Sequence, residues 1–445
     1  MNTWDATETA QRIAAGEVSS REVVQAAIDR LEDWEPKVHA LTHFDPERAL
    51  AQADAPLQGP FGGVPTLIKD LEDLSGAPSA YGSEAARPRT PKTSAASISE
   101  LLKTGLIPLG KTTTSEYGLT GTVEPVGKPP TRNPHNLEHT SGGSSGGAAA
   151  MVAAGVVSLA HGGDGGGSIR IPSSFCGLVG LKPSRDRLTD MAAAKRMAIK
   201  IAQYGVLTRT VRDTANFYAA VEAFAPAKDL PPIGKVEGPS SDKRRIGVFI
   251  DVPMSNHIDP EVRQATEATA KQLEGMGHTV EWIPAPADQQ VADDFLLYWA
   301  FNAALLEIIV RISPTARVGK LEPWTRSLAA YARSNMRHIR ASMRRLRAFE
   351  QRYDALFNDL DVILSPTTAG PAPKLGVISP DVEFETCVQR LTTLLPYTPL
   401  QNVAGAPGIS IPAGKTSDDL PIGVQLGAAK GNERILLELA FALEA

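Results

Sequence analysis

The sequence predicts an α/β fold, and two stretches of it support this prediction. Residues 244–284 have the pattern of a strand, a helix closed by glycine and a second strand, which is typical of a β-sheet covered by helices. Residues 140–182 contain two glycine-rich turns separated by the apolar segment AAAMVAAGVVSLA. We expect this segment to form a helix over about 148–154 and a strand over about 156–161.

Length and composition are those of a soluble globular protein. The chain has 445 residues, of which 42% are hydrophobic and 21% charged, and its formal net charge of −5 argues against a general nucleic-acid binder. The two cysteines, Cys176 and Cys387, fit a reducing cytoplasm, and we expect Cys176 to be a small buried residue. The N-terminus shows no secretory leader, and the apolar run at 148–160 is too short to span a bilayer, so we expect a cytoplasmic protein without membrane contact.

The remaining elements follow from periodicity and turn residues. Residues 5–42 have the pattern of two helices, of which the second begins at Ser19, at capping-box spacing from Glu22, and is expected to end at Trp34 and Pro36. The other predicted elements are, in order, a strand ending at Lys69, a helix at about 94–104, a buried strand beginning near 106, late strands within 361–373 and 396–414, and a final helix from about Asn432.

Between about 285 and 355 the sequence predicts a helical, substrate-side region. Residues 291–310 are apolar and rich in aromatic rings, which we interpret first as core packing and second as contacts to a substrate. The stretch from Arg326 to Tyr353 predicts one helix with an apolar stripe and many arginines. A nucleic-acid surface is one explanation of these arginines, but a solvated amphipathic face fits a net acidic protein better.

Two glycine-rich turns, GGSSGG and GDGGGSIR, carry Ser144 and Ser168. A helix leaving one edge of the fold and a strand returning to it would bring these serines together. A flexible linker would lack the patterned apolar segment between the turns, and a phosphate-binding loop would show the pattern GxxxxGK[ST], which is absent. A third motif, GVPTLIKD, lies upstream and is an apolar strand ending in Lys69.

These motifs together resemble the amidase signature of serine hydrolases. Ser168 follows Ser144 by 24 residues, and Ser144 follows Lys69 by 75, as in that family. The resemblance covers essentially the whole chain, since it extends from the N-terminal helices to 423–440. It rests on GVPTLIKD (63–70), GGSSGG (142–147), GDGGGSIR (163–170) and PSSFCGLVGLKPS (172–184).

The resemblance implies a fold and a mechanism. The fold is a large mixed, twisted β-sheet surrounded by helices, in a single amidase domain over residues 1–445, and no cofactor or metal is expected. In the mechanism Ser168 attacks the carbonyl carbon, Ser144, which follows a cis peptide bond, relays the proton, and Lys69 is the final base. Burial at the end of an apolar strand would favour the neutral amine that a lysine base needs. None of the eight histidines sits in a recognisable nucleophile motif.

The second turn is expected to stabilise the oxyanion. We assign Asp164 and Arg170 a supporting ion pair or hydrogen-bond scaffold around it. The family usually has a larger residue at the position of Gly165, so we expect a roomier loop here. Four consecutive backbone N–H groups can converge on the oxyanion, which larger side chains would obstruct: those of Gly165, Gly166, Gly167 and Ser168.

The expected substrate is a small hydrophobic or aryl amide, or a carbamate. The closest likeness is to aryl acylamidases, nylon-oligomer hydrolases and urethanases, acting as a monomer or homodimer. Residues 184–204 depart most from the family pattern, and we expect them to form a mobile rim of the substrate pocket. Two alternatives stay open: the glutamine-hydrolysing amidase subunit of a tRNA-dependent amidotransferase, and a non-catalytic binding protein on the same scaffold.

Overall fold

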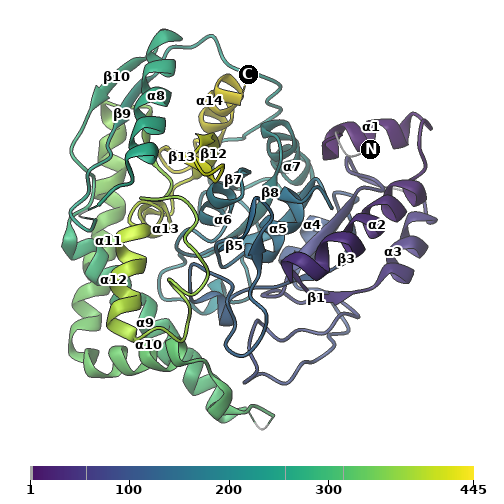
Figure 1. Ribbon diagram of the computed structural model, residues 1–445. Coiled ribbons are helices and arrows are strands. Elements are labelled where there is room, and N and C mark those ends of the chain that lie inside the picture. The colour runs from purple at the N-terminus through teal and green to yellow at the C-terminus, as the bar shows by residue number, and fades with distance from the viewer. Residues whose placement is uncertain (1–3, 57, 256, 314, 445) are drawn as a thin grey trace.

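A mixed, eight-stranded β-sheet forms the centre of the computed structural model, which describes residues 4–56, 58–255, 257–313 and 315–444 (Figure 1). The strands are β1 (Leu41–Phe44), β2 (Pro65–Lys69), β3 (Ile107–Thr112), β4 (Arg132–Asn133), β5 (Asn136–Thr140), β6 (Leu159–Asp164), β7 (Val179–Lys182), β8 (Gln203–Thr208), β9 (Arg245–Val248), β10 (Thr279–Trp282), β11 (Val362–Pro366), β12 (Gly408–Lys415) and β13 (Pro421–Gly427).

The strand order of the central sheet is β10-β9-β11-β13-β12-β7-β8-β6. Strands β10, β9 and β11 run parallel to one another, and the other neighbours pair antiparallel. A three-stranded sheet, β1-β3-β2, and a two-stranded sheet, β4-β5, accompany it. The predicted strand–helix–strand unit of residues 244–284 is β9, a helix and β10, at one edge of the sheet.

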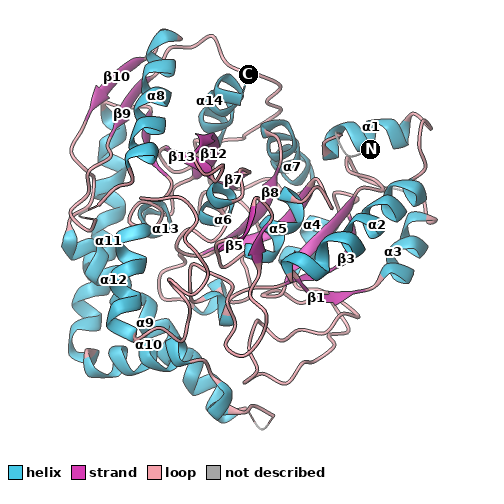
Figure 2. Cartoon of the chain, viewed as in Figure 1, coloured by secondary structure: helices cyan, strands magenta, loops and turns pink. Residues whose placement is uncertain are grey.

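Helices surround the sheet, as Figure 2 shows, which confirms the predicted α/β architecture. In Figure 1, α1, α2 and α3 lie on the right, and α9 to α12 lie together on the opposite side. The α-helices are α1 (Ala6–Ala14), α2 (Ser20–Val38), α3 (Pro46–Ala53), α4 (Ala96–Leu102), α5 (Gly146–Ala153), α6 (Arg170–Phe175), α7 (Val211–Phe224), α8 (Pro260–Gly275), α9 (Gln289–Ile312), α10 (Pro323–Ser334), α11 (Ile339–Asp354), α12 (Phe384–Leu394), α13 (Pro399–Ala404) and α14 (Glu433–Glu444).

Helix α2 shows both an expected start and an unexpected end. The predicted capping box is present, since the Ser19 hydroxyl accepts from the Glu22 N–H and the Glu22 carboxylate accepts from the Ser19 N–H. The expected end at Trp34 and Pro36 was wrong, because the helix continues through Pro36 to Val38. A proline this close to the end removes only one helical hydrogen bond.

The arginine-rich stretch 326–353 forms two helices rather than the predicted single one. Helices α10 and α11 are separated by a short 3-10 turn, η4 (Met336–His338). The amide of Asn335 donates to the carbonyl of Tyr331 at this break. In α11 the buried positions form one stripe and the arginines lie outside it, which agrees with a solvated amphipathic face.

Helix α9 is long and apolar enough to span a membrane by length and composition alone. This is weak evidence, because the core helix of a globular protein passes the same test. One side of α9 packs against α10 and α11, while four aliphatic side chains near its C-terminal end are exposed: Leu305, Ile308, Ile309 and Ile312. The absence of membrane contact, like the single domain over 1–445, stays a prediction.

Residues 184–204 are anchored to the interior at several points, although part of the segment is exposed. Met191 is only 3% exposed and belongs to the main hydrophobic core, and Ile201 is 1% exposed. The buried guanidinium of Arg187 forms ion pairs with Glu222 and Glu433. The segment therefore contributes apolar and ionic contacts to the interior, and its mobility stays a prediction.

We predict that Met191→Ala lowers the free energy of unfolding by about 2–5 kcal/mol, because it empties a filled core position. Equilibrium urea unfolding measures this loss. Met197→Ala, which truncates a half-buried methionine of the same segment, is the matched control and should cost less. Equal losses in the two variants would contradict the assignment of Met191 to the core.

Candidate active site

Lys69 ends strand β2, where this strand lies beside β6. The Thr66 hydroxyl donates to the carbonyl of Leu159 at 3.0 Å, and the Lys69 N–H donates to Nδ1 of His161 at 3.3 Å. The side chains of Lys69 and His161 are fully buried. Burial, together with the charges of nearby lysines, lowers the pKa of His161 to about 3, so its imidazole is a neutral support of the Lys69 backbone.

The amine of Lys69 meets both glycine-rich turns. Its Nζ donates to the hydroxyls of Ser144 and Ser145, each at 2.8 Å, and to the carbonyl of Gly163 at 3.0 Å. Burial lowers the pKa of Lys69 to about 7, and the charge of Asp164 opposes this shift only in part. A substantial fraction of the amine is therefore neutral at neutral pH.

The two serine-bearing turns lie side by side, as the sequence predicted. Helix α5 and strand β6 connect them, and the Ser145 N–H donates to the carbonyl of Ser168 at 3.3 Å. The peptide bond between Gly143 and Ser144 is cis. Ser144 is 1% exposed, whereas Ser168 is 7% exposed and lines the cavity described below.

A fully buried ion pair supports the second turn. The guanidinium of Arg170 donates from Nε and Nη2 to the two carboxylate oxygens of Asp164, each at 3.0 Å. Burial alone would raise the pKa of Asp164, but the charge and hydrogen bonds of Arg170 hold it well below its ordinary value. The other guanidinium hydrogen bonds go to side-chain oxygens of Gln401, Gln425 and Asn402.

The backbone N–H groups of the second turn differ in whether they have a hydrogen-bond acceptor within the protein. The Gly167 N–H donates to Asp164 at 2.7 Å, so it is engaged and differs from the expectation that it faces an oxyanion. Gly167 has a φ of +128°, a conformation that glycine adopts readily and that turns its N–H toward this carboxylate. Among the described residues, the N–H groups of Gly165, Gly166 and Ser168 have no acceptor.

A cavity of about 140 Å³ opens beside Ser168. Its walls come from the loop at 118–121 and from α9, α12 and α13. No charged side chain lines it among the residues that the structure describes. The apolar side chains that form its walls include Val291, Phe295, Leu296, Trp299, Leu391 and Leu395.

Two expectations about this cavity need correction. Phe295 and Trp299 line it, so the aromatic residues of 291–310 do not serve core packing alone. Tyr298 does serve core packing, since it is buried and its hydroxyl is hydrogen-bonded to the backbone of Ile199. The loop at Gly165 is not roomier, because a Cβ there would lie 3.3 Å from two ring carbons of Trp299. The space left by the missing side chain is filled by the indole.

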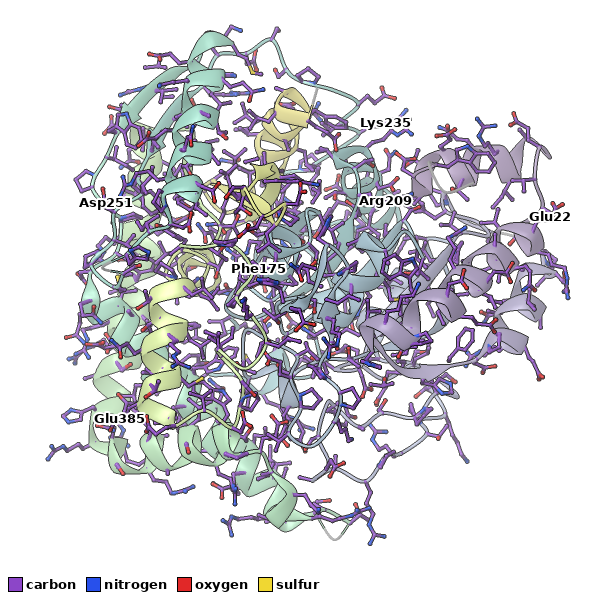
Figure 3. The ribbon with its side chains drawn as sticks, viewed as in Figure 1. Glu22, Phe175, Arg209, Lys235, Asp251 and Glu385 are labelled. Atoms are coloured by element: carbon purple, nitrogen blue, oxygen red, sulfur yellow. The ribbon has the colours of Figure 1, made fainter. Side chains whose placement is uncertain are left out.

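The polar side chains of the site are almost fully buried. Figure 3 places Phe175, the last residue of α6, in the centre of the structure, while Glu22, Asp251 and Glu385 lie at its periphery. Helix α6 begins at Arg170, directly after the Ser168 turn. Residues 184–204 do not line the cavity, which also contradicts their expected place at its rim.

The sequence did not reveal two of the contacts to Lys69. Ser145, adjacent to Ser144 in the first turn, is as close to the amine as Ser144 is. His161 carries no motif signal, and the packing of β2 beside β6, which belong to different sheets, brings it to the Lys69 backbone. Cys176 and Cys387 are both buried and free, so the prediction for Cys176 is confirmed.

Comparison with known proteins agrees with this geometry. The family model described as Amidase matches residues 22–437. The chain belongs to the amidase signature family. The amidase is 41% identical over 447 residues to a Mycobacterium tuberculosis protein named "Putative amidase AmiC", covering 99% of this chain and 94% of that one.

Solved structures give the same result. The amidase superposes on the structure of 6-aminohexanoate cyclic dimer hydrolase with a TM-score of 0.88 at 29% identity, covering 100% of this chain and 97% of the other. It superposes on a bacterial aryl acylamidase of the amidase signature family with a TM-score of 0.86 at 25% identity, covering 99% and 96%. The protein is therefore an amide-hydrolysing enzyme.

We predict that Asp164→Ala lowers the free energy of unfolding by about 3–5 kcal/mol, because Arg170 is left as an unpaired buried charge. The exposed pair of Asp251 and Arg263 provides the matched control, since Asp251→Ala should cost less than about 1 kcal/mol. Urea unfolding of both variants measures the difference. Similar small losses in both would show that the buried pair does not support the turn.

Proposed function

We propose that this amidase cleaves the C–N bond of small hydrophobic or aryl amides through an acyl-enzyme on Ser168. The observation that carries the proposal is the 2.8 Å contact between the buried amine of Lys69 and the Ser144 hydroxyl, beside the Ser168 turn that lines an apolar cavity. The amine donates in this contact, and in its neutral form its lone pair can accept the Ser144 proton instead. A serine hydroxyl is a weak nucleophile and needs a base, and burial gives Lys69 the neutral form that a base requires.

In the proposed first half-reaction, the Ser168 Oγ attacks the carbonyl carbon and its proton passes to the Ser144 oxygen. The proton of Ser144 moves at the same time to the neutral Nζ of Lys69. When the tetrahedral intermediate collapses, the C–N bond breaks and the same relay, run in reverse, protonates the departing amine. Water then attacks the acyl-enzyme with the same help, which releases the acid and restores Ser168.

The proposed oxyanion donors are the backbone N–H groups of Gly165, Gly166 and Ser168. They are unengaged among the described residues, while Gly167 is held by Asp164. Fixed donors of this kind stabilise the charge that develops on the carbonyl oxygen without reorganisation. Asp164 and Arg170 hold the turn in place, and the charge of Asp164 also opposes part of the lowering of the Lys69 pKa.

The cavity favours uncharged acyl or aryl groups. A glutamine substrate carries a charged ammonium and carboxylate, and the described walls offer no charged partner to either. This supports a free-standing amidase over the amidotransferase subunit. A carbamate presents the same carbonyl to Ser168, so we extend the proposal to aryl carbamates. We also propose a cytoplasmic enzyme, acting as a monomer or homodimer, without membrane or nucleic-acid contacts.

The first test of this function is Ser168→Ala. The variant should lose hydrolysis of a small anilide and covalent labelling by a fluorophosphonate probe, because its nucleophile is gone. Turnover and mass spectrometry of the labelled protein measure both. A panel of anilides, aliphatic amides, aryl carbamates and glutamine then defines the substrate range of the enzyme. Turnover of glutamine alone would overturn the proposal, and so would a probe adduct on another serine with activity intact.

The second test is the pH dependence. Since Lys69 must be neutral to accept a proton, kcat/KM should rise with pH through about 7 and level off above it. Lys69→Ala should lower turnover by at least about 10²–10⁴-fold. The pH–rate profile of wild type and variants measures this.

Lys182 provides the matched control for this assignment. Its amine is also fully buried, and burial, followed by the charge of Arg170, lowers its pKa to about 7. Folded Lys182→Met should keep the rising limb near pH 7. If that limb survives in the residual activity of Lys69→Ala, or disappears in Lys182→Met alone, Lys69 is not the titrating base.

A further inference from the structure

Two indole groups hold one loop carbonyl at the edge of the active site. Nε1 of Trp299, in α9, donates to the carbonyl oxygen of Leu119 at 3.0 Å, and Nε1 of Trp324, in α10, donates to the same oxygen at 2.9 Å. The preceding residues Tyr117 and Gly118 have φ values of +50° and +77°. This irregular loop is thus fixed by side chains from two helices.

The same loop packs on the serine of the first turn. A Cβ at Gly118 would lie 3.3 Å from the Ser144 Oγ. A Cβ at Gly143 would lie 2.6 Å from the backbone nitrogen of Thr122 and 2.8 Å from the carbonyl carbon of Gly121. A displacement of the Leu119 carbonyl would therefore move backbone that is in contact with the Ser144 turn.

The ring of Trp299 touches the second turn as well. Two of its carbons lie 3.3 Å from the position of a Cβ at Gly165. Its ring stacks on Phe295, with centroids 5.7 Å apart and an interplanar angle of 26°, and Phe295 lies 3.0 Å from a Cβ position at Gly166. Trp324 packs instead against Phe384, with centroids 5.4 Å apart.

We propose that Trp299 is both a positioning and a specificity-determining residue. Its N–H, together with that of Trp324, fixes the loop 118–121 against Ser144. Its ring closes the cavity over Gly165 and so sets the largest acyl group that fits beside Ser168. This inference rests on the proposed amidase function of the same site, and it explains why the glycine at 165 does not widen the pocket.

The positioning role predicts a non-additive effect of two conservative variants. Trp299→Phe and Trp324→Phe each leave the Leu119 carbonyl one donor, so each should lower kcat on a benzoyl anilide by only about two- to tenfold. The double variant leaves the carbonyl without either donor and should lower kcat by more than the product of the two. KM should change less than kcat, and a multiplicative double variant would overturn this role.

The size limit is tested with acyl groups of different bulk. For Trp299→Ala, the ratio of kcat/KM on 1-naphthoyl anilide to that on benzoyl anilide should rise at least about tenfold over wild type. Trp299→Phe, which keeps a ring over Gly165, should stay closer to the wild-type ratio. An unchanged ratio in folded Trp299→Ala would overturn the role of the ring.

A binding measurement separates this inference from the proposed function. Calorimetry with toluene and 1-methylnaphthalene requires no turnover, and Trp299→Ala should gain affinity for the larger ring relative to toluene by at least about tenfold. If the affinity shift in Trp299→Ala is present but the wild-type enzyme turns over no anilide, the proposed function is overturned and the size limit is supported. Wild type that is active, with neither ratio shifted in Trp299→Ala, would overturn the inference alone.

Discussion

The arrangement of this site depends on one buried amine. Lys69 cannot be solvated where it lies, and its three hydrogen bonds go to Ser144, Ser145 and the carbonyl of Gly163. Desolvation weakens its positive charge, and only the carboxylate of Asp164 opposes that effect. A strand from the small sheet, the first glycine turn and the end of β6 must all meet for this environment to exist.

The negative charge of Asp164 is in turn stabilised mainly by Arg170. Because the guanidinium binds both carboxylate oxygens, Asp164 stays ionised and accepts the N–H groups of Gly167 and Ile169. These bonds hold the turn around Ser168 from its buried side, while the N–H groups of Gly165, Gly166 and Ser168 have no acceptor in the part of the chain that the structure describes. A strong buried ion pair and a buried lysine of lowered pKa thus coexist in one site, although they are far apart in the chain.

Apolar helices complete the site from the opposite direction. Helix α9 brings Phe295 and Trp299 to the glycines of the second turn, and α10 brings Trp324 to the loop at Leu119. The rings of Phe295 and Trp299 occupy the space that the glycines leave. The size of the pocket is therefore set by residues distant in sequence from the turn. The cavity is apolar because its walls come from these helices, whereas the charged groups lie behind the turns.

The sequence alone determined the α/β class, the capping box of α2 and the neighbouring positions of the two serine-bearing turns, because glycine, capping and periodicity act locally. The motifs GVPTLIKD and GGSSGG also marked Lys69 and Ser144, which are hydrogen-bonded to each other, and GDGGGSIR marked Ser168, which lines the adjacent cavity. Tertiary structure decided what depended on distant contacts. It placed His161 and Ser145 around Lys69, filled the space at Gly165 with Trp299, and buried Met191 and Ile201 in the core. No local pattern encodes these outcomes, since each requires two segments far apart in the chain to compete for the same space or the same hydrogen bond.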